Sequence, residues 1–227
     1  MKIGIFENLA NNAYLLTKAL RKNGCEAELV LNKTSSFAMG QPLWEDKEFE
    51  IETELIMEDK IKYEDWQARA KKLGWEKPPW IREEDIHNSR ISRLLAMMKS
   101  PLLYLKLLAR LGPGACLMMS AVDPLINEMQ KYDLIIAYGV SPIYAFLSGK
   151  PYIAVVYGAD LTIIPFQKDV MASLQRKAYE NARYVTGGDP LFVNYLTKLN
   201  IEKKWELMAV PMDTERYRPA AMSFEQL

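Results

Sequence analysis

Short apolar runs alternate with amphipathic stretches near the start of the chain. Residues 2–6 form one apolar run, residues 12–23 carry a helical pattern that ends at Gly24, and residues 26–31 form a second apolar run. Apolar runs of this length beside turn residues are typical of buried strands, and the 3.6-residue period between them predicts a helix. We therefore expect the chain to open with a strand, a helix and a second strand.

The second half of the chain repeats this alternation. Three pairs of residues place a capping side chain before a proline and predict helix starts: Asp123-Pro124, Ser141-Pro142 and Asp189-Pro190. Helices are expected to end near Lys131 and Gly149, and another covers roughly 169–181. The expected strands are 133–138, 152–157, one beginning at 184–186 and one near 205–209. Nearly continuous apolar strands between helices indicate an α/β fold with a doubly wound, mostly parallel, Rossmann-like sheet.

The middle segment, residues 32–120, has a different pattern. Phe49, Ile51, Thr53 and Leu55 alternate with glutamates, which predicts a strand with one solvated face. Four tryptophans lie in this segment: Trp44, Trp66, Trp75 and Trp80. We expect 32–120 to be a helix-rich elaboration of the sheet domain and not a separate domain.

Residues 90–119 raise the question of a membrane contact. A helix is expected to start at Ser100-Pro101, with Lys106 and Arg110 on one face and leucines around most of the rest. Such a helix is either buried in the domain, placed at a membrane interface to reach a lipid-linked acceptor, or docked on a partner subunit. The pattern favours burial.

Composition narrows the class of protein. Apolar residues make up 49% of the 227 residues, and the formal net charge is zero, so no global field attracts nucleic acid. Cys25 and Cys116 have no metal-ligand spacing, and no metal site is expected. The first residues lack the long apolar run of a signal peptide, and no stretch reaches about 18 uninterrupted apolar residues. We expect a cytoplasmic protein, with peripheral contact at the inner face of the membrane as the alternative.

Ligands of open α/β sheets bind outside the carboxyl ends of the strands, near the point where the strand order reverses. Four loops follow the expected strands, and glycine, asparagine and aspartate in them suit close backbone approach and sugar hydroxyls. The alternative is that these residues only form turns. The candidate site residues are Asn8, Asn11, Asn12, Tyr138, Gly139, Ser141, Tyr157, Gly158, Gly187, Gly188 and Asp189.

Several motifs together resemble the first domain of retaining, two-domain sugar transferases, family 4 of the GT-B glycosyltransferases. Residues 210–219, Val-Pro-Met-Asp-Thr-Glu-Arg-Tyr-Arg-Pro, resemble the segment that ends that domain, and 220–227 would begin the interdomain linker. Residues 2–31 resemble its opening unit, residues 132–160 its central stretch, and residues 178–196 a later strand and helix. The order and spacing of these motifs are more specific than any one of them.

The chain departs from the family pattern at several loops. The first loop has asparagines and no glycine, Tyr157 stands where a histidine is usual, and Gly187-Gly188 stand where a serine is common. The glutamate-rich motif of the donor domain has no counterpart.

The resemblance implies an acceptor-binding half, residues 1–219, whose C-terminal donor domain is missing or supplied by another chain. The complete enzyme would move a sugar from a nucleotide-sugar to a glycan or lipid-linked acceptor, and this chain alone would be inactive. The chain itself would carry no cofactor. Asp160 is the candidate contact to the acceptor hydroxyl, with a helix or turn cap as its alternative role.

Two rival hypotheses remain. One is a domain that binds a sugar or a partner transferase subunit without catalysis. The other is a nucleotide-binding enzyme of another class, which the absence of a Gly-Xaa-Gly-Xaa-Xaa-Gly or phosphate-loop motif disfavours. The single histidine, His87, lies beside acids without a second ligand and is expected to be a surface or capping residue.

Overall fold

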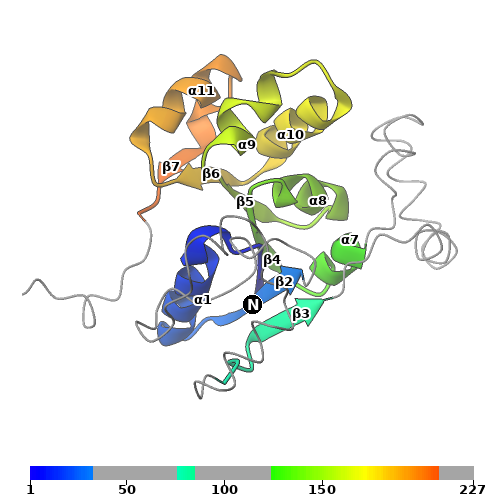
Figure 1. The fold of residues 1–227 in the computed structure, drawn as a ribbon, viewed down its shortest axis with the longest axis vertical. Coiled ribbons are helices and arrows are strands. Elements are labelled where there is room, and N and C mark those ends of the chain that lie inside the picture. Colours follow the sequence, from blue (N-terminus) through cyan, green and yellow to red (C-terminus); the bar gives the residue numbers. More distant parts are fainter. Residues whose placement is uncertain (33–75, 85–123, 210–227) are drawn as a thin grey trace, which may run out of the picture.

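The computed structural model describes residues 1–32, 76–84 and 124–209 (Figure 1). Within these ranges one sheet contains seven strands in the order β3-β2-β1-β4-β5-β6-β7, and every neighbouring pair is parallel. The strands are β1 (Lys2–Phe6), β2 (Glu26–Asn32), β3 (Ile81–Glu84), β4 (Leu134–Tyr138), β5 (Tyr152–Val155), β6 (Tyr184–Gly187) and β7 (Trp205–Leu207). This topology confirms the predicted Rossmann-like α/β fold.

Helices connect the strands along the sheet. The α-helices of the described ranges are α1 (Asn12–Lys22), α7 (Pro124–Met129), α8 (Ser141–Ser148), α9 (Ala159–Thr162), α10 (Val170–Asn181) and α11 (Val193–Lys198). Short 3-10 helices are η1 (Leu9–Asn11), η2 (Ile164–Phe166), η3 (Pro190–Phe192) and η4 (Glu202–Lys204). Strand order reverses between β1 and β4, so the loops after these two strands lie at the topological switch point.

The two faces of the sheet carry separate apolar cores, because successive side chains of a strand point to opposite faces. On β1, Ile3 and Ile5 pack with Ala13 and Tyr14 of α1, whereas Phe6 packs into the other core. That larger core contains residues from α7, α8, α10 and α11. Figure 1 shows α1 on one side of the central strands and α7 and α8 on the other.

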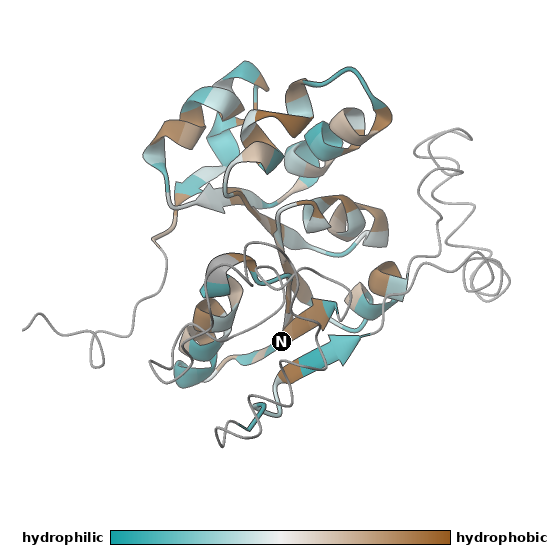
Figure 2. Ribbon diagram, viewed as in Figure 1, coloured by the Kyte–Doolittle hydropathy of each residue, from teal (hydrophilic) through white to brown (hydrophobic). Residues whose placement is uncertain are grey.

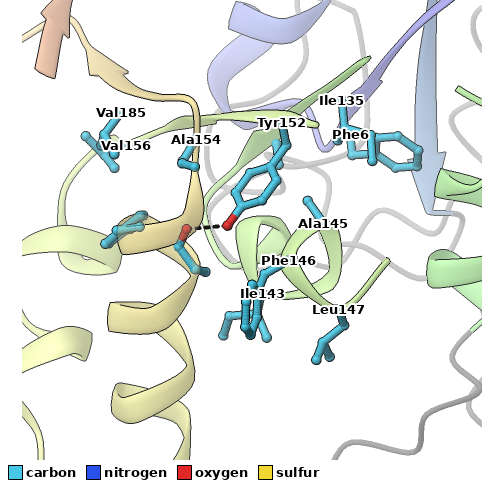
Figure 3. Close-up of a cluster of buried hydrophobic side chains, with 14 of the residues drawn as sticks. Phe6, Ile135, Ile143, Ala145, Phe146, Leu147, Tyr152, Ala154, Val156 and Val185 are labelled. Carbon is cyan, nitrogen blue, oxygen red and sulfur yellow. Dashed lines mark hydrogen bonds between the residues drawn. The ribbon is translucent and has the colours of Figure 1, made fainter. Parts of the chain in front are cut away.

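The larger core surrounds Tyr152 at the start of β5. Figure 3 shows its ring directed toward α10, with Ala154 on one side and Ala145 of α8 on the other. The Tyr152 hydroxyl donates a hydrogen bond to the carbonyl of Ala178 in α10, so its polar end is satisfied inside the core. The bond ties β5 to α10, the helix that carries two residues of the site described below.

Three elements differ from the sequence predictions. β3 was not predicted, because only Ile81 is buried in its Ile-Arg-Glu-Glu sequence, and Figure 2 shows the strand as mostly hydrophilic. β5 ends at Val155 and not at 157, since the Tyr157 amide turns to the Asp160 side chain. Ser141 was predicted to cap α8, but it is the first residue of the helix and its side chain makes no capping bond.

The other two proline-associated starts agree with the sequence. Asp189 accepts a hydrogen bond from the Leu191 amide at 2.8 Å and caps η3, and α7 begins at Pro124. α10 begins after Asp169, whose side chain accepts from the Ala172 amide at 2.7 Å. Asp189 thus caps its helix as the local sequence predicted, whereas Asp123, the predicted cap of α7, lies outside the described residues.

Several predictions fall outside the described residues. These are the strand around 48–55, the helix within 90–119, His87, Cys116, and the segments 210–219 and 220–227. Within the part of the chain that the structure describes, no helix has the length and apolar character needed to cross a membrane.

Candidate functional site

The loop between β1 and α1 is held by two buried asparagines. Asn8 is fully buried, and its Oδ1 accepts a hydrogen bond from the Tyr14 amide at 2.9 Å, which satisfies a free N–H in the first turn of α1. Its Nδ2 donates to Asn11 Oδ1 at 3.4 Å. Asn11 has a left-handed backbone, φ +64°, which asparagine tolerates better than most residues. Asn8 therefore shapes the loop, and a ligand contact by Asn8 stays a prediction.

Glu7 begins this loop and directs a carboxyl group into the protein. Its backbone φ is +69°, unusual for a glutamate, and its amide still donates to the carbonyl of Val30 in β2 at 3.4 Å. Glu7 Oε2 is buried and has no hydrogen-bond partner. Burial raises the pKa of Glu7 to about 7; the Ser141 hydroxyl acts in the opposite direction, and the negative charge of Asp160 raises the pKa further.

The loop after β4 comes close to the Glu7 carboxyl. Gly139 has φ +61°, and a Cβ added there would lie 3.0 Å from Glu7 Oε2. Glycine is therefore needed at 139 both for the backbone conformation and for space. Ser141, fully buried at the start of α8, has a hydroxyl without a hydrogen-bond partner. Gly139 and Ser141, predicted as site residues, lie beside Glu7.

Two stacked tyrosines lie on the α1 face of the same edge. The rings of Tyr138, the last residue of β4, and Tyr157, after β5, are 5.2 Å apart between centroids and inclined by 18°. Neither hydroxyl makes a hydrogen bond of good geometry, although the two hydroxyls lie close enough to affect each other's pKa, and burial raises the pKa of both phenols. Asn12 lies near enough to Tyr157 to lower its pKa, against the dominant effect of burial. The three predicted residues are thus brought together.

Asp160 organises the turn after β5. Its Oδ1 accepts hydrogen bonds from the amides of Gly158 at 2.7 Å and Tyr157 at 3.1 Å. Burial raises the pKa of Asp160, although these backbone bonds and the Tyr179 hydroxyl favour its charged form. Asp160 therefore caps the turn, which is the alternative role that the sequence predicts for it. A contact between Asp160 and an acceptor hydroxyl stays a prediction.

A hydrogen-bond chain from α10 joins this turn to the β4 loop. Tyr179 donates from its hydroxyl to the Asp160 carbonyl at 3.0 Å and lies 3.4 Å from Asp160 Oδ2. Gln175 Nε2 donates to the Tyr179 hydroxyl at 2.7 Å and to the Gly139 carbonyl at 3.1 Å. Helix α10 therefore fixes the relative positions of Asp160 and Gly139.

These loops together form a cluster of buried polar side chains that we call the switch-point cluster. Its members come from the ends of β1, β4 and β5 and from α10. Six of its buried atoms have no hydrogen-bond partner: Glu7 Oε2, Asn11 Nδ2, Tyr138 Oη, Ser141 Oγ, Tyr157 Oη and Gln175 Oε1. Buried polar atoms in proteins are nearly always paired with protein, water or a ligand. The cluster is therefore the candidate binding site.

The predicted residues after β6 serve packing and capping. A Cβ on Gly187 would lie 2.7 Å from the Val156 carbonyl, so the glycine permits close packing of β6 against β5. Gly187 accepts a hydrogen bond from the Met208 amide at 3.1 Å, and Asp189 caps η3. Gly188 has only the Met208 carbonyl near its side-chain position, at 3.9 Å. Ligand contacts by these residues stay predictions.

Three residues of the cluster are not among the predicted site residues: Glu7, Gln175 and Tyr179. Glu7 stands in the loop after the first strand, where an acid normally points to solvent, and only its burial sets it apart. Gln175 and Tyr179 occupy successive turns of α10 and have no local signal. Their spacing of four residues places them on one helix face, but the sequence does not say which face meets the loops.

The switch-point cluster carries two carboxyl groups. Among the described residues, no group of three or more histidines, cysteines, aspartates or glutamates comes together in a way that could hold a metal ion. The chemistry available in the cluster is hydrogen bonding by carboxyl, hydroxyl and amide groups, together with proton exchange at Glu7 near neutral pH.

No protein-family model matches the chain, and no curated protein matches it. Among solved structures, the chain is similar to Anabaena HepE in complex with UDP, with 11% identity and a TM-score of 0.48 over 95% of this chain and 45% of HepE. The complex of HepE with UDP and glucose gives 12% identity and a TM-score of 0.49 over 97% of this chain and 47% of that one.

A third similar structure is UDP-GlcNAc 2-epimerase from Methanocaldococcus jannaschii, with 11% identity and a TM-score of 0.46 over 91% of this chain and 45% of the epimerase. The chain thus spans less than half the length of each of these proteins. At this level of similarity, nothing about ligand or reaction transfers from them to this chain.

Proposed function

We propose that this chain is the acceptor-binding part of a glycosyltransferase that moves a sugar from a nucleotide-sugar to a glycan or lipid-linked acceptor. The observation that carries the proposal is the switch-point cluster, with six buried unpartnered polar atoms at the edge where ligands of α/β sheets bind. The resemblance of residues 2–31, 132–160, 178–196 and 210–219 to family 4 transferases, which act with retention, supports it.

The side chains of the cluster suit sugar hydroxyls. Each hydroxyl of a sugar donates one hydrogen bond and accepts others, and the cluster offers hydroxyl, amide and carboxyl groups for both roles. Asp160 holds the turn through Oδ1, which leaves Oδ2 with only the longer contacts to Tyr157 and Tyr179. In this proposal Asp160 orients the acceptor hydroxyl, and a separate donor domain binds the nucleotide diphosphate.

Calorimetric titration of the chain tests the proposal. UDP-glucose and UDP-GlcNAc are titrated in parallel with a panel of neutral oligosaccharides and short-chain lipid-linked sugars. The proposal expects measurable binding of at least one acceptor and weak or no binding of the nucleotide-sugars. Tight binding of a nucleotide-sugar to this chain alone, without acceptor binding, overturns it.

One observation favours a non-catalytic binding domain as the second candidate. Asp160 already serves as the acceptor for two backbone amides, a structural role that requires no chemistry. Asp160→Asn keeps Oδ1 as an acceptor and removes the charge. In the transferase proposal, this variant binds the glycan more weakly at unchanged thermal stability. Equal glycan affinity in the variant and the wild type assigns Asp160 to the turn alone.

A further inference from the structure

The backbone at Glu7 is held in an unfavourable conformation. A glutamate at φ +69° carries strain of roughly 1–3 kcal/mol, and such strain persists only where the surroundings impose it. The Glu7 amide, directly after β1, donates a hydrogen bond to the Val30 carbonyl. The next residue, the buried Asn8, is held to α1 by a hydrogen bond from the Tyr14 amide. Both sides of Glu7 are thus fixed, so the direction of its side chain is set by the fold.

The fold aims this side chain at the loop after β4. A Cβ added to Gly139 would lie 3.0 Å from Glu7 Oε2. The Ser141 hydroxyl lies close enough to the carboxyl to lower its pKa, against the larger effect of burial. Both Glu7 Oε2 and Ser141 Oγ are buried without a hydrogen-bond partner. The Glu7 carboxyl and the Ser141 hydroxyl therefore face each other, and the hydroxyl favours the charged carboxyl, while Glu7 Oε2 and Ser141 Oγ can each still take a further partner.

We propose that Glu7 is the ligand-binding carboxyl of the switch-point cluster, and that it selects an uncharged, hydroxyl-rich ligand over a phosphate. This inference rests on the proposed function for the location of the site, and it adds the residue and the ligand class. A sugar hydroxyl donates its hydrogen to Glu7 Oε2 and accepts from Ser141 Oγ or Asn11 Nδ2.

The charges of the described residues disfavour an anionic ligand in the cluster. The charged group that acts most strongly on Glu7 among the described residues is Asp160, which has the same sign. Tyr138 and Tyr157 face the same edge as neutral phenols, because burial raises the pKa of both. A diphosphate placed here would meet two carboxyl groups, which is repulsive at close range and in a buried site. A neutral polyol meets only hydrogen-bonding groups.

Binding is then linked to the ionisation of Glu7. A hydroxyl donates a stronger hydrogen bond to a carboxylate than to a neutral carboxylic acid. Since burial raises the pKa of Glu7 to about 7, the ligand-free site is partly protonated near neutral pH, and ligand binding releases the proton. Affinity for a neutral glycan is therefore expected to rise about tenfold from pH 6 to pH 8.

The experiment is a set of calorimetric titrations of the full chain at pH 6 and pH 8, in two buffers of different ionisation enthalpy. The probes are the neutral oligosaccharide panel, UDP and inorganic pyrophosphate. The variants are Glu7→Gln and the matched control Glu26→Gln, which changes an exposed glutamate at the amino end of β2. Circular dichroism and thermal unfolding confirm that both variants are folded.

The expected result is glycan binding with proton release in the wild type and in Glu26→Gln. Glu7→Gln loses both the proton release and the pH dependence and binds about tenfold more weakly at pH 8, and neither UDP nor pyrophosphate competes. Glycan binding that is identical in Glu7→Gln overturns the inference about Glu7 and leaves the proposed function standing. Displacement of the glycan by pyrophosphate overturns the ligand class. Absence of any glycan binding to the wild type rejects both proposals.

Discussion

Two polar regions of this sheet bury carboxyl groups and treat them in opposite ways. One, which we call the paired network, joins β1, β2, β3 and α7 through Lys2, Glu28, Arg82, Tyr132 and Glu128. Lys2 Nζ lies 2.9 Å from Glu28 Oε1, the Tyr132 hydroxyl donates to Glu28 Oε2 at 2.8 Å, and Arg82 Nη1 lies 3.2 Å from Glu128 Oε1. The other is the switch-point cluster, where the Glu7 carboxyl faces Ser141 and the charge of Asp160.

The pKa values of the two glutamates express this difference. Burial raises the pKa of Glu28, but the hydrogen bonds and charges of Lys2, Tyr132 and Arg82 outweigh it and lower the pKa overall. Burial also raises the pKa of Glu7, and there Asp160 adds to the effect while only Ser141 opposes it. The sheet thus surrounds Glu28 with cations and a phenol, and places Glu7 without a cationic partner at the edge of the candidate site.

The largest effect is expected from removing the unpaired carboxyl. Because the pKa of Glu7 is raised from 4.5 to about 7, the folded state holds a proton that the unfolded state releases. This stabilisation is complete below pH 4.5 and is lost as the pH rises through 7, a change of roughly 3 kcal/mol. Glu7→Gln should therefore unfold with a higher free energy than the wild type at pH 8.5 and with nearly the same free energy at pH 4. Urea unfolding at both pH values measures this difference, and Glu26→Gln is the control.

A smaller effect is expected where Gly139 meets the cluster. Gly139→Ala places a Cβ at φ +61° and 3.0 Å from Glu7 Oε2, so it should lower the free energy of unfolding by about 2 kcal/mol. Gly24→Ala is matched in backbone conformation, φ +81°, but has no atom within 4 Å of the added Cβ, and it should cost about 1 kcal/mol. Denaturant unfolding compares the two. NMR titration of the Glu7 carboxyl should change only in Gly139→Ala; equal behaviour of the two variants would contradict the contact.

The paired network should respond to loss of one hydrogen bond. Tyr132→Phe removes the donor to Glu28 Oε2, and a hydrogen bond to a charged group typically contributes about 1.5 kcal/mol. The pKa of Glu28 should also rise, since the Tyr132 hydroxyl lowers it. Urea unfolding at pH 7 and carboxyl NMR measure these two changes. A stability equal to that of the wild type would show that the hydroxyl contributes nothing to the network.

The smallest effect is expected from the equivalent change in the switch-point cluster. Tyr157→Phe removes a buried hydroxyl that has no hydrogen-bond partner and keeps the ring stacked on Tyr138. The free energy of unfolding should change by less than about 0.5 kcal/mol or rise slightly, because an unsatisfied polar group is removed. Thermal unfolding of Tyr157→Phe beside Tyr132→Phe makes the comparison direct. A loss as large as that of Tyr132→Phe would mean that the Tyr157 hydroxyl is paired in solution.

Most of the fold could be predicted from local patterns. The apolar runs that became β1, β2, β4 and β5 are short and nearly continuous, and capping residues such as Asp189 mark the connections between strands. β3 could not be predicted, because three of its four residues are charged. It pairs with β2 through backbone hydrogen bonds, and Arg82 lies 3.8 Å from Glu28 Oε2 and 3.2 Å from Glu128 Oε1, contacts that join distant parts of the chain.

The candidate site was predicted in part. Asn11, Tyr138, Gly139, Ser141 and Tyr157 do meet at one edge, as expected for loops after neighbouring parallel strands. The residues after β6 serve packing and capping, and a ligand contact by them stays a prediction. Both kinds of loop contain the same glycines and polar residues, so composition alone could not separate them.

The sequence by itself determined most of the strands and helices of the described residues, because hydrophobic period and helix caps act over a few residues. Only the tertiary structure decided which carboxyl groups are paired and which are not. Glu7 and Glu28 are the same residue type, but burial raises the pKa of Glu7, with the charge of Asp160 adding to the effect, whereas Lys2, Tyr132 and Arg82 outweigh burial and lower the pKa of Glu28. Burial and charge act through space, and the packing of helices α7, α8 and α9 against the sheet sets them.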